Sequence, residues 1–195
     1  MDRRRLLLLA PAGLLGAGLL GAAGWTMLRR EEEGAVPIGG PFRLRAPDGR
    51  EVTDAEFRGR WMLVYFGYTH CPDACPTALQ DIANALDSLG PEAKRKAAAL
   101  FITVDPERDT PAVMGDYVSA FDAGITGLSG TPEQVAAAAK AYRVYYAKHP
   151  KAGGDYDMDH SSIIYVMDPH GRFAANFTHE TPPDAMAAKL RALMA

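Results

Sequence analysis

Two cysteines, Cys71 and Cys75, are the only ones among the 195 residues, and they stand four positions apart. Their sulfur atoms can lie close enough to form a disulfide or to share one metal ion. Thiolates are soft ligands that favour Cu(I) or Zn over Mg or Ca. A disulfide that closes so short a loop removes little chain entropy, so a purely structural bridge is weakly motivated. The pair therefore indicates redox or metal chemistry, and its spacing leaves both open.

The elements around the pair should hold both sulfurs at the end of a strand. Trp61–Phe66 is a continuous apolar and aromatic run, typical of a strand covered on both faces, and Gly67 ends it. Each cysteine precedes a proline, which disfavours helical backbone, so we expect both cysteines outside the following helix. Pro76 suits the first helical position, and the helix dipole there would stabilise a thiolate at Cys75. The buried face of this helix would contain Leu79, Ile82, Ala83, Leu86 and Leu89.

A third possible ligand, His160, lies far along the chain, after the sequence Asp157-Met158-Asp159 and just before a predicted strand. A lone histidine is more often a surface or packing residue than a metal ligand, so its position alone does not assign that role. His70 adjoins Cys71 but should point elsewhere if the backbone there is extended. The remaining histidines stand in predicted loops or turns: His149, His170 and His179.

Residues 1–30 are predicted to form a membrane segment. Arg3–Arg5 precede an uncharged stretch, Leu6–Leu28, which is rich in Leu, Ala and Gly and long enough to span a bilayer as a helix. Small residues at 21–24 also offer a processing site, which would make the segment a cleaved signal peptide. We favour a membrane anchor, because the uncharged stretch continues past that site. A polar linker over 31–40 would then lead to the folded domain.

The orientation of this segment decides which compartment the domain occupies. Basic residues flank both sides, but the amino terminus and Arg3–Arg5 favour a cytoplasmic N-terminus. We therefore expect a single-pass protein of the bacterial inner membrane, with its C-terminal domain on the periplasmic or external side. That compartment is oxidising, so a cysteine pair there must be kept reduced if it is to bind a soft metal.

Composition and the order of elements predict one mixed α/β domain over residues 41–195. The chain is long enough for a full core, its net charge is −3, and no basic patch indicates nucleic acid binding. Thr110 and Thr131 each precede a proline and are predicted helix N-caps. The predicted elements are a hairpin over 42–53, a helical turn over 54–58, a polar surface segment over 91–97, strands over 61–66, 100–104, 125–128, 161–167 and 172–178, helices over 76–89, 111–120, 135–146 and 183–193, and a mobile loop over 149–159.

Four motifs make the sequence resemble the Sco/SenC family, thioredoxin-like copper proteins needed to assemble cytochrome c oxidase. They lie at 57–61 (FRGRW), 64–77 (VYFGYTHCPDACPT), 103–111 (TVDPERDTP) and 159–161 (DHS). The match extends from about Phe42 to the C-terminus, and the preceding membrane segment also fits that family. A Cys-x-x-x-Cys motif alone would not be specific, whereas this combination is.

The resemblance implies a thioredoxin-like fold with an N-terminal β-hairpin extension, an insertion before the last strand pair, and one preceding transmembrane helix. It implies that Cys71, Cys75 and His160 bind copper, and that the two cysteines also form a redox disulfide. Two thiolates and one imidazole suit Cu(I), and Cu(II) can be held with an added oxygen or water. The implied partners are a copper donor protein and subunit II of cytochrome c oxidase, which needs copper delivery, cysteine reduction or both.

The resemblance also includes Asp105 and Asp159. Asp159 is either an acceptor that orients His160 or a solvated loop carboxylate. Met158 offers a weak thioether donor, but a loop methionine is more often a packing residue. We assign neither Asp159 nor Met158 as a ligand.

Two other functions are compatible with a cysteine pair on this kind of fold. A thiol–disulfide oxidoreductase without a copper delivery role would use Cys71 and Cys75 but would not need His160. A peroxidase of the peroxiredoxin type is disfavoured, because its nucleophile has a threonine three residues before it. Here Tyr68 and Pro72 occupy those positions.

Overall fold

The computed structural model describes residues 37–121 and 124–195. The predicted membrane segment over 1–30 and most of the linker over 31–40 lie outside the described residues. Ile38–Ala195 form one compact unit, which contains all the helices and strands named here. Among the described residues, no helix is both long enough and apolar enough to cross a bilayer.

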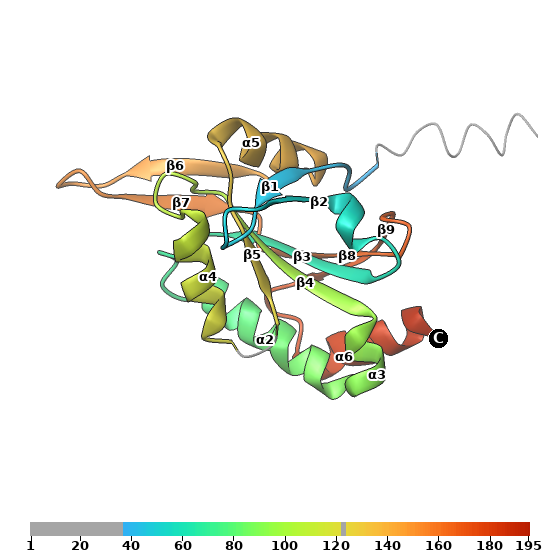
Figure 1. The fold of residues 1–195 in the computed structure, drawn as a ribbon. Helices are drawn as coiled ribbons and strands as arrows, with labels where there is room; N and C mark the ends of the chain where they lie inside the picture. Colours follow the sequence, from blue (N-terminus) through green and yellow to red (C-terminus); the bar gives the residue numbers. More distant parts are fainter. Residues whose placement is uncertain (1–36, 122–123) are drawn as a thin grey trace, which may run out of the picture. The chain divides into compact units, whose positions relative to one another are not determined.

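The strands of the central sheet are β3 (Trp61–Gly67), β4 (Ala97–Thr103), β5 (Thr126–Leu128), β8 (Ile163–Met167) and β9 (Phe173–Thr178). Their order across the sheet is β5-β4-β3-β8-β9 (Figure 1). β3, β4 and β5 are parallel, whereas β8 runs antiparallel to both β3 and β9. β3 and β4 are almost wholly buried, because their continuous apolar sequence suits strands covered on both faces.

The helices of the described residues are α2 (Ala74–Ser88), α3 (Pro91–Arg95), α4 (Pro111–Ser119), α5 (Pro132–Ala141) and α6 (Pro183–Met194). α2 and α6 pack side by side on one face of the sheet, with α3 at the end of α2 (Figure 1). α5 lies on the opposite face, and α4 packs against β5. Thr110 and Thr131 cap α4 and α5 through their side chains, as predicted.

The predicted N-terminal extension is present. β1 (Arg43–Arg45) and β2 (Glu51–Thr53) form an antiparallel hairpin, and the 3-10 helix η1 (Asp54–Phe57) follows it directly. Leu44 and Val52 face each other across the hairpin and are both buried. Together with the sheet and helices, this hairpin confirms the predicted mixed α/β architecture.

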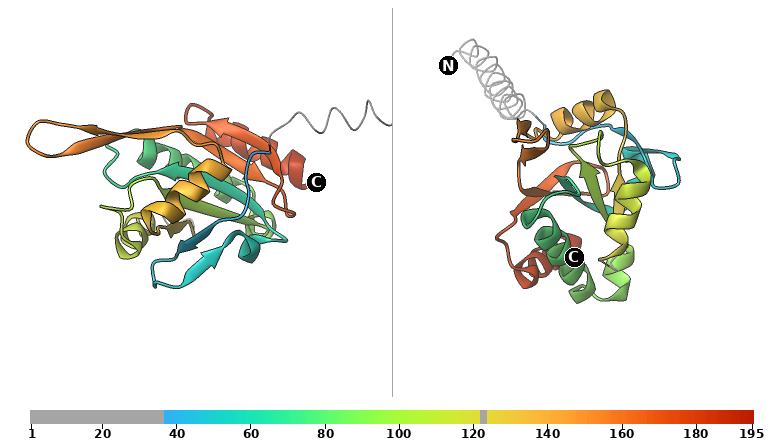
Figure 2. Two further views of the ribbon diagram at one scale, coloured as in Figure 1. Left: turned by 90° about the horizontal axis from the view of Figure 1, so that it is seen from above. Right: turned by 90° about the vertical axis from the view of Figure 1, so that its left-hand side faces the viewer.

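The segment over 149–159, predicted to be a mobile loop, is instead part of a second hairpin. β6 (Tyr146–Pro150) and β7 (Tyr156–His160) pair along their whole length and form a two-stranded sheet of their own. Polar residues suggested a loop, but they pair across the strands, as in the contact of 2.8 Å between His149 Nε2 and Asp159 Oδ2. This hairpin projects beyond the central sheet (Figure 2, left) and is the predicted insertion before the last strand pair.

The helix predicted over 135–146 is also shorter than expected. It ends as α5 at Ala141, and Arg143 has a φ of 56°, the left-handed conformation that commonly ends a helix. The N–H of Val144 closes this end on the carbonyl of Ala139 at 2.8 Å. The chain is therefore free to extend into β6 from Tyr146.

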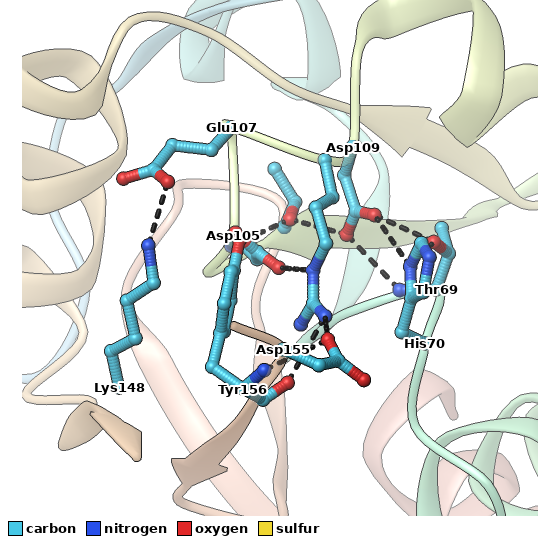
Figure 3. A network of polar contacts seen from close by, with 10 residues as sticks. Thr69, His70, Asp105, Glu107, Asp109, Lys148, Asp155 and Tyr156 are labelled. Atoms are coloured by element: carbon cyan, nitrogen blue, oxygen red, sulfur yellow. Dashed lines mark hydrogen bonds and ion pairs between the residues drawn. The ribbon is translucent and has the colours of Figure 1, made fainter. Parts of the chain in front are cut away.

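A buried carboxylate, Asp109, anchors the loop that leads from β3 to the cysteines (Figure 3). It accepts hydrogen bonds from the Thr69 backbone N–H at 3.0 Å and from the Thr69 hydroxyl at 2.6 Å. The Thr103 hydroxyl at the end of β4 donates a third bond, at 2.7 Å. Asp109 thus joins the ends of two neighbouring strands just before Cys71.

We expect Asp109→Ala to lower the free energy of unfolding by about 3 kcal/mol, because it leaves one buried and two partly buried donors without an acceptor. Urea denaturation of the soluble domain measures this change. Asp116→Ala is the matched control, since Asp116 is exposed on α4, and its effect should stay within about 0.5 kcal/mol. Equal stability of the two variants would contradict the anchoring role of Asp109.

Candidate metal centre

Three side chains from distant parts of the chain meet at the carboxyl end of β3. One sulfur each of Cys71 and Cys75 and one ring nitrogen of His160 all lie within 4.8 Å of one another. Cys75 Sγ and His160 Nε2 lie 3.4 Å apart. Cys75 is fully buried, whereas Cys71 and His160 are half-buried. The structure therefore brings together the three residues that the resemblance assigned to metal binding.

The backbone around Cys75 differs from the sequence prediction. α2 begins at Ala74, so Cys75 lies in the first helical turn rather than before it. Pro76 takes the third helical position, and this is tolerated because the first four N–H groups of a helix have no intrahelical partner. Cys71 remains outside the helix, as predicted, and accepts a hydrogen bond from the Cys75 N–H at 3.4 Å.

The two sulfurs differ in protonation. A hydrogen bond from Cys75 lowers the pKa of Cys71 well below the ordinary thiol value, and His160 and backbone N–H groups add to this effect against the cost of burial. The same hydrogen bond, together with burial, raises the pKa of Cys75. The helix N-terminus was expected to stabilise a thiolate at Cys75, but the hydrogen bond between the two sulfurs lowers the pKa of Cys71 and so favours the thiolate there.

His160 is the last residue of β7, and two tyrosines orient its ring. The rings of Tyr65 and Tyr68 meet it edge-on, at centroid distances of 6.1 Å and 5.8 Å. Its Nδ1 lies 3.3 Å from the carbonyl oxygen of Ser161. For metal binding, a proton on Nδ1 would be donated to that carbonyl, so that Nε2, which faces the sulfurs, offers its lone pair to the metal.

Asp159 does not orient His160. Its carboxylate contacts His149 at 2.8 Å, because successive residues of a strand point to opposite faces. This alternation rules out Asp159 as the acceptor that orients His160. Asp159 is instead a solvated surface carboxylate, the other role that the sequence allowed. Met158 shares the inward face with His160 and is 7% exposed, as expected of a packing residue.

Two residues behind Cys75 shape the site, Tyr65 and Gly67. The sequence placed Tyr65 in the strand and Gly67 at its end, both within the motif over 64–77, without a role at the site. A side chain at Gly67 would bring a Cβ atom within 2.6 Å of Cys75 Sγ, so only glycine leaves room for this sulfur. The buried hydroxyl of Tyr65 lies 3.9 Å from the same sulfur. Their positions on the cysteine side of β3 were not recognisable, because a continuous apolar run does not reveal which residue faces which layer.

The other histidines stay outside the cluster. His70 turns away from Cys71, as expected, with its Nδ1 3.1 Å from the Thr69 hydroxyl (Figure 3). His149 contacts Asp159, and His170 and His179 are exposed. Among the described residues, the Cys71–Cys75–His160 cluster is the group of metal-ligating side chains with suitable spacing.

The fold and this cluster define a thioredoxin-like domain with a two-sulfur, one-nitrogen site at the end of its central strand. The chain belongs to the SCO1/SenC family, whose family model matches residues 30–195. Both the resemblance drawn from the motifs and the predicted fold class are therefore confirmed for the described domain.

Solved structures and curated relatives agree with this assignment. ScoI of Bradyrhizobium japonicum with copper bound is 49% identical, with a TM-score of 0.74 over 80% of this chain and 98% of that one. Yeast Sco1 with copper bound is 38% identical, with a TM-score of 0.75 over 82% of this chain and 89% of that one. Protein SCO1 homolog 1, mitochondrial, of Arabidopsis thaliana is 43% identical to this chain. The match covers 72% of this chain but only 42% of that longer protein.

The two thiol environments predict different alkylation behaviour. In the reduced, metal-free protein, the rate for Cys71 with iodoacetamide should change little between pH 8 and pH 6, because its lowered pKa keeps it a thiolate. An ordinary thiol with a pKa of about 8.5 would slow by roughly a hundredfold over that range. Cys75 should react slowly throughout, since it is buried and its pKa is raised.

Mass spectrometry of the alkylated peptides separates the two cysteines in the unmodified sequence. A steep fall in the rate for Cys71 towards pH 6, or faster labelling of Cys75 than of Cys71, would contradict the assignment of the thiolate.

Proposed function

We propose that this protein is a copper metallochaperone of cytochrome c oxidase assembly, which carries copper on Cys71, Cys75 and His160. The observation that carries the proposal is the convergence of two sulfurs and one imidazole nitrogen within 4.8 Å. Copper is the cargo in this function, so the site has to hold it and also release it. The half-buried positions of Cys71 and His160 provide the access that release requires.

The donor set favours copper over zinc. A thiolate is a soft ligand and an imidazole is a borderline one, and three such ligands satisfy Cu(I). A structural zinc site is closed by four ligands, whereas this cluster offers three among the described residues. An added oxygen or water would complete a site for Cu(II). The copper-bound relatives from Bradyrhizobium japonicum and yeast, at 49% and 38% identity, support the same choice of metal.

The proposed recipient is subunit II of cytochrome c oxidase, whose dinuclear copper site has cysteine ligands. Delivery to such a site involves transfer between soft ligands, which two thiolates on the donor suit. The reduced pair can also reduce a disulfide of the recipient: two electrons and two protons pass to the partner, and Cys71 and Cys75 become a disulfide. A copper donor protein would then reload the site after the pair is reduced again.

The alternative function is a thiol–disulfide oxidoreductase without copper delivery. The low pKa of Cys71 favours it, because a thiolate is the attacking species in disulfide exchange. His160 separates the two functions, since disulfide exchange needs only the cysteines while a three-ligand copper site needs the imidazole as well.

We expect His160→Ala to weaken Cu(I) binding by more than about a hundredfold, because losing a ligand should cost more than losing a group that merely orients one. The purified, reduced soluble domain is titrated anaerobically against a competing Cu(I) chelator. The rate at which the variant reduces a model disulfide is measured in parallel and should stay within a few-fold of the unmodified protein.

His149→Ala is the matched control, because His149 lies on the same hairpin but contacts only exposed residues. It should leave both copper affinity and disulfide exchange unchanged. Unchanged copper affinity in His160→Ala would remove the imidazole from the site and favour the oxidoreductase. In cells, His160→Ala should abolish oxidase assembly under the copper proposal and preserve it under the alternative.

We further propose that Leu6–Leu28 anchors the protein in the bacterial inner membrane, with the C-terminal domain in the periplasm. The uncharged stretch and the basic residues before it support this topology. Alkaline phosphatase, which is active only outside the cytoplasm, should therefore be active when fused to the C-terminus of the full chain. Activity of a cytoplasm-only reporter at the same position would contradict it, and recovery of the fusion without residues 1–30 would indicate a cleaved signal peptide.

A further inference from the structure

The β6–β7 hairpin, which ends in His160, is held to the rest of the domain mainly by side chains. Within residues 37–121 and 124–195, β6 and β7 pair only with each other, and no ladder of backbone hydrogen bonds joins them to the central sheet. The hairpin projects beyond the body of the domain in two views (Figures 1 and 2). Where His160 lies relative to the cysteines therefore depends on what docks this hairpin.

Arg108, in the loop after β4, contacts the hairpin directly. Its Nη1 donates to the carbonyl of Tyr156 at 3.0 Å and approaches the carboxylate of Asp155 at 3.3 Å. Its guanidinium carbon lies 3.7 Å from the centre of the Tyr156 ring, which is close cation–π stacking. Its Nε donates to Asp105 Oδ2 at 2.5 Å, so the guanidinium is fixed from the side of the body.

Tyr156, on the hairpin, also contacts the loop after β4. Its hydroxyl donates to Asp105 Oδ1 at 2.8 Å, so both oxygens of one carboxylate are used, one by the loop and one by the hairpin (Figure 3). Lys148 on β6 adds a weaker connection, with its Nζ 3.8 Å from the centre of the Tyr156 ring and 2.7 Å from Glu107. Both strands of the hairpin are thereby tied to the same loop.

The contacts of the buried Asp105 and Arg108 side chains are stronger than the exposed contact between Lys148 and Glu107. Asp105 is 3% exposed, and the Arg108 side chain is 18% exposed, whereas Lys148 and Glu107 are largely in water. A charged pair in so little solvent is screened weakly, and breaking it leaves a charge without its partner. An exposed pair contributes little. Asp105, Arg108 and Tyr156 therefore form the effective attachment, which we call the clasp.

The clasp communicates with His160 by two routes. Tyr156, Met158 and His160 are every second residue of β7 and therefore share its inward face. A displacement of Tyr156 would thus move His160 as well. The Arg108 guanidinium also lies 5.9 Å from the ring of Tyr68, which in turn meets the His160 ring at 5.8 Å. The outward residues of β7, Asp157 and Asp159, instead form ion pairs within the hairpin.

We propose that Asp105, Arg108 and Tyr156 are positioning residues that dock the β6–β7 hairpin so that His160 faces the two sulfurs. This inference rests on the proposed function in that it treats His160 as the ligand being positioned. Opening of the clasp would withdraw the imidazole while both sulfurs stay in place. The affinity for copper would then depend on residues that never touch the metal.

The test compares Tyr156→Phe and Arg108→Lys with the matched control Asp157→Asn, which changes a half-exposed residue that faces away from the clasp and pairs with Lys151 within the hairpin. Hydrogen exchange of the hairpin amides in the reduced, metal-free domain reports docking without copper. We expect exchange over residues 146–160 to quicken by about tenfold in both clasp variants, the change expected for losing one hydrogen bond to a charged group. Exchange of β3 and β4 amides should not change, and neither should any amide in Asp157→Asn.

Anaerobic Cu(I) titration then tests the link to the ligand. Each clasp variant should bind copper about tenfold more weakly than the unmodified protein, and Tyr156→Phe should have no further effect in a His160→Ala background. Unchanged hairpin exchange would overturn the proposal, as would an equal loss of affinity for Tyr156→Phe with and without His160. Absence of copper binding by the unmodified protein would instead refute the proposed function, and the exchange measurement would still decide whether the clasp docks the hairpin.

Discussion

The site depends on the approach of two elements that are distant in the sequence, the start of α2 and the end of β7. Cys75 Sγ and His160 Nε2 lie 3.4 Å apart, and neither position is set by local sequence. The sulfur fits because residue 67 lacks a side chain, and the imidazole is packed edge-on against Tyr65 and Tyr68. Packing on both sides brings all three donor atoms within 4.8 Å of one another, close enough to contact one cation.

The three ligands are attached to the domain in unequal ways, which fits the proposed need both to hold and to release a soft cation. Cys75 is fixed in the first turn of a buried helix, whereas Cys71 lies in a half-buried loop outside that helix. His160 belongs to a hairpin that hydrogen-bonds to the central sheet through no strand ladder. A ligand set whose imidazole lies on a separately docked hairpin suits a carrier better than a permanent metal site, whose ligands are all preorganised.

Elements with strong local signals were predictable, and those fixed by distant contacts were not. The buried strands and the caps at Thr110 and Thr131 follow from apolar runs and from a threonine before a proline. The β6–β7 hairpin was missed, because its charged residues are satisfied only by partners on the facing strand, such as His149 for Asp159. The meeting of His160 with the cysteines came from resemblance to a family, since spacing along the chain carries no information about it.

In the proposed site, both sulfurs and the imidazole bind one copper ion at the same time. X-ray absorption spectroscopy of the reduced domain, loaded with one equivalent of Cu(I), counts the atoms around the metal directly. A site of Cys71, Cys75 and His160 should give two sulfur neighbours and one nitrogen neighbour, with the multiple-scattering signature of an imidazole ring that is lost in His160→Ala. A spectrum with sulfur neighbours alone in the unmodified protein, identical to that of the variant, would contradict it.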